Sequence, residues 1–515
     1  MNNKYKKKSI VAVAIFSAMI GSMYFIWTPL KDKINEDVIE NRNMAERPTL
    51  NIHDIGAYPD QANSYVNDHL PFRGTMVKMN SAVDYYVFHS SSNRDDVIGK
   101  NGWLFYNQDD TMPIYKGQKL YSEDQLQTIA NNIQRSSDYL ERQGVKYVVY
   151  IAPEKERIYP EYMPDYYGKP AEVNLLNQVV GYLRANTDVP IVCPYDSLMQ
   201  AKEDYPDREV YWQTDTHWNA WGAYIGACEL FDAIDAKWNG NGIQVEEIKA
   251  QPGDLVNGLN LRGIYDCGVD YTVTGYETEG THPVQEPDFF GHWKYESPDA
   301  PNGSILVHRD SFSSALMPYI TNSFKQSDLV HQGSWDNALV EEEHPDVFVY
   351  ECVERNLDLM LRYNYNNLTC EADPMKYVDK LIEDKERYSI FITVNGDASD
   401  VVSPELAEKL QELGLTVDLS AKDNRGKSYA ATLYNGHLLE ESMSDTTVSY
   451  AGTLENGLVY STSSTGGENG NSVLSYDSED YSMNQSGLNI LVYDNEHNVG
   501  IDACVLHDGK KMERR

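Results

Sequence analysis

The fold of this chain is decided at Ile305-Leu306-Val307-His308-Arg309-Asp310-Ser311-Phe312-Ser313. The stretch opens with three apolar residues of the kind that form a buried strand. Asp310 and Ser311 then indicate a turn, because short polar side chains favour the positions that cap a helix, and we expect a helix from Ser313. A strand that passes directly into a helix is the unit from which parallel α/β sheets are built.

The same alternation of helices and short apolar strands runs from about residue 122 to residue 365. Ser122 and Gly144 are typical residues for the start and the end of one helix, and a second helix is expected after Asn219, through Ile234. Further elements are predicted as a helix over 173–183 and strands over 147–151, 191–192 and 347–350. We assign residues 29–370 to an α/β domain on a parallel sheet.

Two parts of the chain depart from this pattern. Residues 238–300 are rich in Gly, Tyr, Asn and Pro and show no clear period, so they are interpreted as an insertion that either borders a substrate cleft or is a mere surface excursion. Beyond about residue 375 the chain turns to Thr, Ser, Gly and short alternating strands, with one helix from Ser403 to Leu413 that ends at Gly414. Residues 375–515 are therefore predicted to form a β-rich α+β domain.

The N-terminus carries an almost unbroken apolar run from Ser9 to Trp27, which is long enough to cross a bilayer. Four lysines precede it, at positions 4, 6, 7 and 8, so the tip is expected in the cytoplasm. No small-x-small cleavage site precedes Pro29, which favours a retained signal anchor over a removed signal peptide. We therefore predict a single-pass protein of the cell membrane, with residues 1–28 as tip and transmembrane helix and the remainder extracytoplasmic.

Charge and cysteine content exclude several classes of partner. The formal charge of −36 argues against nucleic acid and against a direct anionic lipid surface, because both are bound through clustered Lys and Arg, whereas a neutral glycan remains acceptable. The six cysteines lack the C-x-x-C spacing of zinc and redox sites, so neither a metal nor a cofactor is predicted. Whether Cys267 and Cys370 form a disulfide cannot be deduced from sequence.

Two segments carry candidate catalytic side chains: the stretch from Tyr211 to Asn219, with Asp215 and His217, and the turn with Ser311. We expect each at a transition from extended chain to helix, so that both meet at the carboxyl edge of the sheet. An imidazole can remove the proton of a serine hydroxyl at neutral pH, and a carboxylate can orient that imidazole. We predict a triad of Ser311, His217 and Asp215, in which backbone N–H groups at the serine turn stabilise an oxyanion.

Each half of this triad has an ordinary alternative. Asp310 and Ser311 before a helix also fit a plain cap, and Asp215 with His217 also fit a capped turn that packs beside Trp218. The joint occurrence of both segments in one α/β pattern favours the catalytic interpretation.

The motifs of residues 60–365 resemble the SGNH-like acetyltransferases of the alginate O-acetylation group and the related DHHW proteins. The resemblance is carried, in chain order, by Asp68-His69-Leu70-Pro71-Phe72-Arg73, Gly102-Trp103-Leu104-Phe105, Ala152-Pro153-Glu154-Lys155, Tyr159-Pro160-Glu161-Tyr162-Met163-Pro164, Asp215-Thr216-His217-Trp218 and Asp310-Ser311-Phe312. As in that family, the Asp-x-His pair precedes the serine. The resemblance implies an SGNH-hydrolase-like, flavodoxin-like fold with three layers around a parallel sheet.

The same resemblance implies the function. Family members move acetyl groups to hydroxyls of secreted polysaccharides and commonly receive acetyl from a multipass membrane O-acyltransferase, so both are expected partners. It also implies that Arg355 supports the site. His308 and Arg309 stand where the family more often has small residues, which leaves oxyanion geometry and acceptor choice open.

The C-terminal domain resembles the interleukin-like EMT inducer domain through residues 390–394, the helix from Ser403 to Leu413, and Gly487-Leu488-Asn489-Ile490-Leu491-Val492-Tyr493-Asp494, with its two halves in swapped order. The resemblance implies a module that binds glycan or another wall component; a structural cap without a ligand is the alternative. For the whole chain we expect an extracytoplasmic polysaccharide O-acetyltransferase. The alternatives are a carbohydrate esterase with the same triad and a non-catalytic glycan-binding scaffold.

Overall fold

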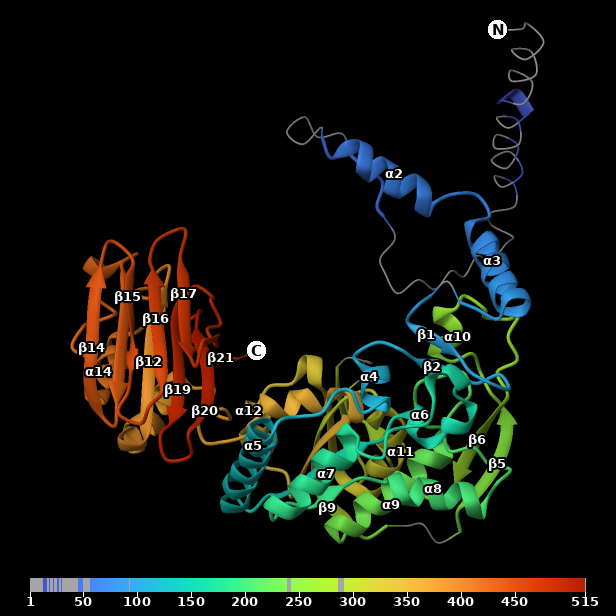
Figure 1. Ribbon diagram of the computed structural model, residues 1–515. Helices are drawn as coiled ribbons and strands as arrows, with labels where there is room; N and C mark the ends of the chain where they lie inside the picture. Colours follow the sequence, from blue (N-terminus) through green and yellow to red (C-terminus); the bar gives the residue numbers. More distant parts are fainter. Residues whose placement is uncertain are drawn as a thin grey trace, which may run out of the picture.

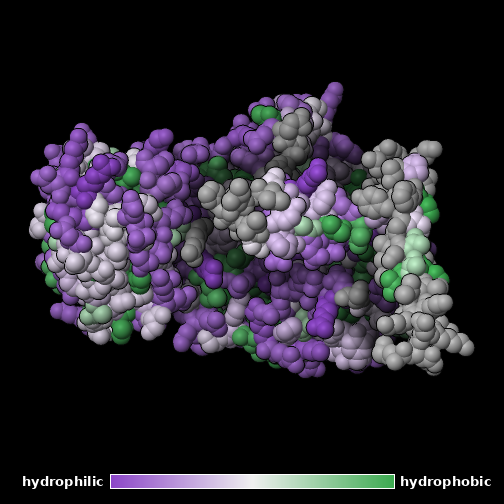
Figure 2. Space-filling view, turned by 90° about the horizontal axis from the view of Figure 1, so that it is seen from above, coloured by the Kyte–Doolittle hydropathy of each residue, from purple (hydrophilic) through white to green (hydrophobic). Residues whose placement is uncertain are grey.

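The computed structural model describes residues 45–49, 56–91, 93–238, 242–285 and 291–514, with isolated positions between 13 and 29. The predicted anchor from Ser9 to Trp27 falls mostly outside the described residues. Within it, the structure describes residues 13–15, 18, 22 and 26, and these are helical. Among the helices that are described, none combines the length and the apolar character needed to cross a bilayer. Most of the coloured surface in Figure 2 is hydrophilic, in line with the net charge of −36.

A seven-stranded sheet forms the centre of the α/β part (Figure 1). Five of its strands run parallel, and in spatial order they are β4 (Ile191–Val192), β3 (Lys146–Ala152), β11 (Val347–Val353), β9 (Asn302–Arg309) and β10 (Phe324–His331). Every residue of β11 is buried, as expected for a central strand that is covered on both faces.

Helices pack on both faces of this sheet, which confirms the predicted three-layer α/β architecture. One core lies between the sheet and helices that include α9 (Ala220–Ile234) and α11 (Ser313–Ser323), and the other between the sheet and α5 (Glu123–Arg142) and α7 (Leu175–Asn186). Other helices of this part are α4 (Thr111–Tyr115), α6 (Lys155–Ile158), α8 (Tyr195–Asp204) and α12 (Ala338–Glu343). Short 3₁₀ helices lie at Pro160–Tyr162, Asp165–Tyr167, Gln332–Ser334 and Glu354–Leu361.

The predicted helix starts are confirmed by their caps. Ser122 and Gln125 form a reciprocal capping box at α5, and the Asn219 side chain accepts the Gly222 N–H at α9. These residues satisfy N–H groups that have no partner within their helix.

The prediction of a parallel sheet was wrong at one edge. There, β8 (His292–Glu296) pairs antiparallel with β10, and β7 (His282–Pro283) pairs antiparallel with β8. Both strands come from the insertion predicted at 238–300, which also contains a β5 (Gln244–Lys249) and β6 (Val269–Thr274) pair and the short helix α10 (Asp254–Gly258). The residues of β5 are mostly exposed, so no buried apolar period reveals that strand in the sequence.

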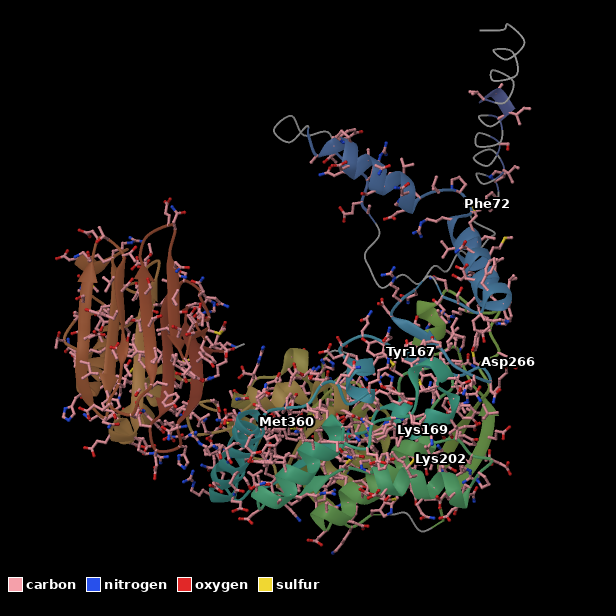
Figure 3. The ribbon with its side chains drawn as sticks, viewed as in Figure 1. Phe72, Tyr167, Lys169, Lys202, Asp266 and Met360 are labelled. Atoms are coloured by element: carbon pink, nitrogen blue, oxygen red, sulfur yellow. The ribbon has the colours of Figure 1, made fainter. Side chains whose placement is uncertain are left out.

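Residues 56–106 lead into the α/β part through α2 (Tyr58–Asp68), α3 (Arg73–Phe88) and a pair of short strands, β1 (Asp96–Ile98) and β2 (Leu104–Tyr106). Phe72 lies at the corner between α2 and α3 and adopts a left-handed backbone, with φ of 57°. Figure 3 shows this corner far from the helices that cover the central sheet.

The C-terminal part is a β sandwich with helices on one face. Its larger sheet is antiparallel, in the order β14 (His437–Ser444), β13 (Ser428–Tyr434), β12 (Tyr388–Asn395), β19 (Gly487–Asp494), β20 (Val499–Leu506) and β21 (Met512–Glu513). The smaller sheet contains β15 (Val448–Thr453), β16 (Val459–Thr465), β17 (Asn471–Tyr476) and β18 (Glu479–Asp480). Helices α13 (Pro374–Glu383) and α14 (Pro404–Leu413) pack on the other face of the larger sheet, and 3₁₀ turns lie at Lys385–Arg387 and Lys422–Asn424.

The sandwich contacts the α/β part through polar groups. Arg135 of α5 pairs with the buried Asp494 at 3.1 Å, and the Asn366 side chain donates to the Ile501 carbonyl at 3.1 Å. The resemblance of residues 375–515 to the EMT inducer domain stays a prediction. All six cysteines are free thiols; Cys193 and Cys228 are half-buried and the other four are buried.

Candidate active site

Ser311 lies in the turn between β9 and α11, as predicted. Strand β9 ends at Arg309 and α11 begins at Ser313, so the serine stands between them at the carboxyl edge of the parallel strands. The Asp310 side chain accepts the Phe312 N–H at 2.9 Å and the Val353 N–H at 2.7 Å. The turn is thereby tied to the end of β11.

The backbone donors of this turn differ from the expectation for an oxyanion site. The Phe312 N–H is engaged by Asp310, so it is not available to a substrate oxygen. The Ser311 N–H donates to no protein acceptor within the described part of the chain, which leaves it as the candidate oxyanion donor.

The segment that carries Asp215 and His217 does not follow a sheet strand, which corrects the expectation that both segments lie at strand-to-helix transitions. Residues 211–218 form an irregular loop that a single bridge between Tyr211 and Trp218 closes. Helix α9 begins directly afterwards, at Ala220. The loop reaches the serine turn through Trp218, whose indole N–H donates to the Phe312 carbonyl at 3.0 Å.

The structure brings the three predicted triad residues into one hydrogen-bonded row. The Ser311 hydroxyl donates to His217 Nε2, with an Oγ to Nε2 distance of 2.8 Å. His217 Nδ1–H donates to Asp215 Oδ1 at 2.6 Å, and the His217 backbone N–H donates to the same oxygen at 3.1 Å. All three residues are half-buried. In this tautomer, Nε2 is free to accept the serine proton.

The electrostatics of the row favour a charged imidazole paired with a carboxylate. Burial opposes the charge of His217, but the hydrogen bond and negative charge of Asp215 outweigh it and raise the pKa of His217 above its ordinary value. Burial likewise opposes ionisation of Asp215, yet hydrogen bonds and the charge of His217 hold the pKa of Asp215 below its ordinary value. This environment stabilises an imidazolium that forms when the serine gives up its proton.

A residue of the insertion supports the histidine loop, and sequence reasoning missed it. The Asp254 N–H donates to Asp215 Oδ2 at 2.9 Å, while the Asp254 carboxylate accepts the Thr216 N–H at 2.8 Å and the Thr216 hydroxyl at 2.6 Å. Gly253 permits this approach, because a Cβ there would lie 2.3 Å from the Thr214 carbonyl oxygen. In the sequence, the role of Asp254 is indicated only by the adjacent Gly253, within an insertion that has no helical or strand periodicity.

Lys155 holds the same loop through hydrogen bonds to backbone carbonyl groups. Its buried ammonium donates to the carbonyl oxygens of Leu104, Gln213 and Asp215 at 2.7, 2.9 and 2.9 Å. Burial lowers the pKa of Lys155 to about 7. The sequence marked Lys155 only as part of a family motif and assigned it no role.

Arg355, predicted to support the site, does not contact the triad directly, because the Phe312 ring lies between its guanidinium and His217. Its guanidinium donates to Glu154 at 2.7 Å and lies 5.6 Å from the centre of the Phe312 ring, which in turn lies 4.9 Å from the His217 ring. Its positive charge opposes protonation of His217. The Glu154 backbone N–H donates to Glu354, which forms a buried ion pair with Arg157.

Two clusters among the described residues have side chains of the kind that hold metal ions. They are Asp215 with His217 and Asp254, and Asp494 with Glu496 and His497. In the first cluster, protein N–H and O–H groups already engage the carboxylates. In the second, Asp494 already pairs with Arg135 and Arg387. Protein donors therefore satisfy both clusters.

Residues 97–290 match the family model described as "SGNH hydrolase-like domain, acetyltransferase AlgX". The matched segment contains the histidine loop and Asp254, and it ends before Ser311. Residues 97–290 are thus similar to an SGNH hydrolase-like domain of the AlgX type, and the resemblance drawn from the motifs is confirmed over this segment.

The curated proteins that this chain is similar to include several described as probable alginate O-acetylase AlgJ. The probable alginate O-acetylase AlgJ of Pseudomonas aeruginosa is 30% identical over 229 residues, which are 43% of this chain and 54% of that protein. The chain therefore spans about half the length of the curated relatives it matches.

Two solved structures are also similar to this chain. A DHHW family protein from Eubacterium siraeum aligns with a TM-score of 0.37 and 14% identity, over 53% of this chain and 99% of that one. The O-acetyltransferase domain of Pseudomonas putida AlgJ aligns with a TM-score of 0.35 and 20% identity, over 52% of this chain and 93% of that one.

Proposed function

We propose that this chain is a serine O-acyltransferase that moves acetyl groups to hydroxyls of a cell-surface or secreted polysaccharide. The observation that carries the proposal is the row from Ser311 Oγ through His217 to Asp215, with donor-to-acceptor distances of 2.8 and 2.6 Å. Such a row is what a serine needs to act as a nucleophile at neutral pH. The match to an acetyltransferase family and the relatives titled probable alginate O-acetylase support acetyl as the transferred group.

The reaction takes place in two half-steps. In the first, Ser311 Oγ attacks the acetyl carbonyl of a donor while His217 Nε2 takes the serine proton; the donor's leaving group then departs with that proton, and an acetyl-serine remains. In the second, a sugar hydroxyl gives its proton to His217 and attacks the acetyl-serine, and Ser311 regains a proton as the ester product leaves. Asp215 stabilises the imidazolium in both half-steps, and the Ser311 N–H is the candidate oxyanion donor.

The proposed setting is the outer face of a cell membrane. The apolar run from Ser9 to Trp27, preceded by four lysines, is proposed as a retained anchor that places the remainder outside the cytoplasm. A multipass membrane O-acyltransferase is the proposed source of acetyl, since the anchor would hold the catalytic domain beside such a partner. Arg355 is proposed to tune His217 through its charge. The C-terminal sandwich is proposed to bind glycan.

The test is to incubate the chain with a chromogenic acetyl ester, with and without a neutral oligosaccharide acceptor, and to examine the products by mass spectrometry. Acetylated oligosaccharide that disappears in the Ser311→Ala variant supports transfer. Release of acetate alone, equally dependent on Ser311, would instead identify a carbohydrate esterase with the same residues. If Ser311→Ala leaves both products unchanged, the catalytic proposal fails and the non-catalytic scaffold remains.

A further inference from the structure

Two carboxylic acids lie buried beneath the turn that carries Ser311. Asp310 directly precedes the serine, and Glu351 comes from the neighbouring strand β11; each exposes 2% of its surface. The reaction proposed above uses neither side chain. Two acids so close together in the interior need a physical reason, since a buried charge is stable only with partners.

Glu351 holds the turn on both sides of the serine. Its Oε2 atom accepts the Asp310 N–H at 3.0 Å and the Ser313 hydroxyl at 2.7 Å. Its other oxygen, Oε1, has no hydrogen-bond donor. One oxygen of this side chain therefore holds the turn through two hydrogen bonds, and the other oxygen accepts no hydrogen bond.

Asp310 has the opposite character, because donors surround it. Its Oδ1 accepts the Phe312 N–H, and its Oδ2 accepts the Val353 N–H at 2.7 Å and the Asn356 side-chain amide at 3.0 Å. These are the partners that an ionised carboxylate requires, since it can only accept hydrogen bonds.

A proton on Glu351 leaves a single negative charge in this buried pair of acids, on the side chain that has the donors. Burial and the neighbouring charge of Asp310 raise the pKa of Glu351 well above its ordinary value, which favours the neutral form of the Glu351 carboxyl group. The other titratable groups around Glu351 are Arg309 of β9, whose positive charge opposes this shift in part, Tyr150 of β3, and the buried Cys352 thiol of β11. The Arg309 guanidinium lies 3.9 Å from the centre of the Trp293 ring and donates to the Asp310 carbonyl rather than to Glu351.

We propose that Glu351 is a positioning residue that, as a neutral carboxylic acid, donates a hydrogen bond to Asp310 and so holds Ser311 in line with His217. This inference rests on the proposed function, because the group it positions is the proposed nucleophile. Loss of the Glu351 proton leaves two adjacent buried carboxylates that repel each other and displace the turn. The reactivity of Ser311 therefore rises with pH as His217 loses its proton, and falls again at alkaline pH as Glu351 loses its own.

The Glu351→Gln variant separates this role from simple packing. A glutamine oxygen can accept the Asp310 N–H and the Ser313 hydroxyl, and its amide can donate to the Asp310 carboxylate, yet it has no proton to lose in the alkaline range. Glu351→Leu fills similar space but can make none of these bonds. Glu156→Gln is the matched control, because Glu156 is another buried acid whose pKa burial raises well above its ordinary value, and it makes no hydrogen bond to the serine turn.

The experiment measures the rate at which a serine-directed sulfonyl fluoride labels Ser311 in the full chain, by intact mass, from acid to alkaline pH. We expect wild type and Glu156→Gln to lose rate at alkaline pH, and Glu351→Gln to keep its rate there. Glu351→Leu is expected to label at least about tenfold more slowly at every pH, because small displacements of a nucleophile are costly. Thermal unfolding of each variant shows that it is folded.

An alkaline decline in Glu351→Gln equal to that of wild type would overturn the inference, as would equal rates in the Gln and Leu variants. If wild type fails to label at any pH, the proposed function fails. Infrared difference spectra then decide the inference independently: a protonated carboxyl band present in wild type and missing in Glu351→Gln supports it, and its absence in wild type contradicts it.

Discussion

The serine turn and the histidine loop are joined by the Ser311–His217 and Trp218–Phe312 hydrogen bonds, yet they are held in place by different means. Ser311 stands at the end of a buried strand, and the Glu351 side chain and the Val353 N–H of the adjacent strand β11 hold its turn. His217 stands in an irregular loop outside the sheet, held by Lys155 from below and by Asp254 from the insertion. Periodic backbone structure positions the nucleophile, whereas a few individual side chains position the base.

The largest effect is expected from breaking the Ser311–His217 hydrogen bond between the two regions. His217→Ala removes the acceptor of the serine proton, and we expect acetyl transfer to fall by about 10³-fold or more. The Ser311→Ala, His217→Ala double variant should be no slower than either single variant, because the two side chains act as one unit. Steady-state rates with an acetyl ester measure this, and additive losses would show that the residues act separately.

The next largest effect is expected on stability, from loss of the Lys155 side chain that supports the histidine loop. Lys155→Met removes three hydrogen bonds to carbonyl oxygens, although the Gln213 carbonyl keeps the Leu104 N–H as a donor, and we expect a loss of about 2–3 kcal/mol in the free energy of unfolding. Urea unfolding measures it. Lys202→Met is the control, because it removes a partly buried lysine that pairs with Glu161 and donates to one carbonyl oxygen, that of Ile158, rather than to three.

The same variant carries a pH signature. The pKa of Lys155 is about 7 in the folded chain and about 10.4 in an unfolded one, so between these values the unfolded state binds more protons. The contribution of Lys155 to the free energy of unfolding of the wild-type chain therefore rises as the pH rises from about 7 to about 10.4. The Lys155→Met variant lacks this dependence of the free energy of unfolding on pH. Parallel slopes in the two proteins would contradict a lowered pKa at Lys155.

A smaller effect is expected where the insertion contacts the loop. Gly253→Ala places a methyl group 2.3 Å from the Thr214 carbonyl oxygen, which must push the insertion away and cost about 1–3 kcal/mol of stability. Activity should fall with it, because Asp254 moves away from Thr216. Gly181→Ala in α7 is the matched control: its Cβ meets open space, and we expect a gain of up to about 1 kcal/mol. Equal behaviour of the two variants would refute the close contact at Gly253.

The smallest effect is expected from Asp254→Asn. The amide keeps one acceptor for the Thr216 N–H and loses the acceptor for the Thr216 hydroxyl, so activity should fall by only a few fold, or about 1 kcal/mol. Removal of the negative charge also lowers the pKa of His217, so the acid limb of the rate profile moves to lower pH. Asp266→Asn, in the same insertion, is the control. An acid limb that stays in place or moves upward would exclude the charge of Asp254 as an influence on His217.

Much of the fold and part of the site could be predicted from local pattern. Ser122, Asn219 and Ser403 mark helix starts because caps act within one turn of the chain, and the apolar run before Ser311 marks a central strand. The antiparallel edge formed by β7 and β8 could not be predicted, because exposed or very short strands leave no period in the sequence.

The sequence by itself determined the α/β alternation, the turn at Ser311 and the pairing of Asp215 with His217, because each depends on residues a few positions apart. Only the tertiary structure decided that His217 and Ser311, 94 positions apart in the sequence, come within 2.8 Å of each other, and that Lys155, Asp254 and Glu351 support this contact. The physical reason is that hydrogen bonds between distant segments are selected by the packing of the whole domain, and no local period records them.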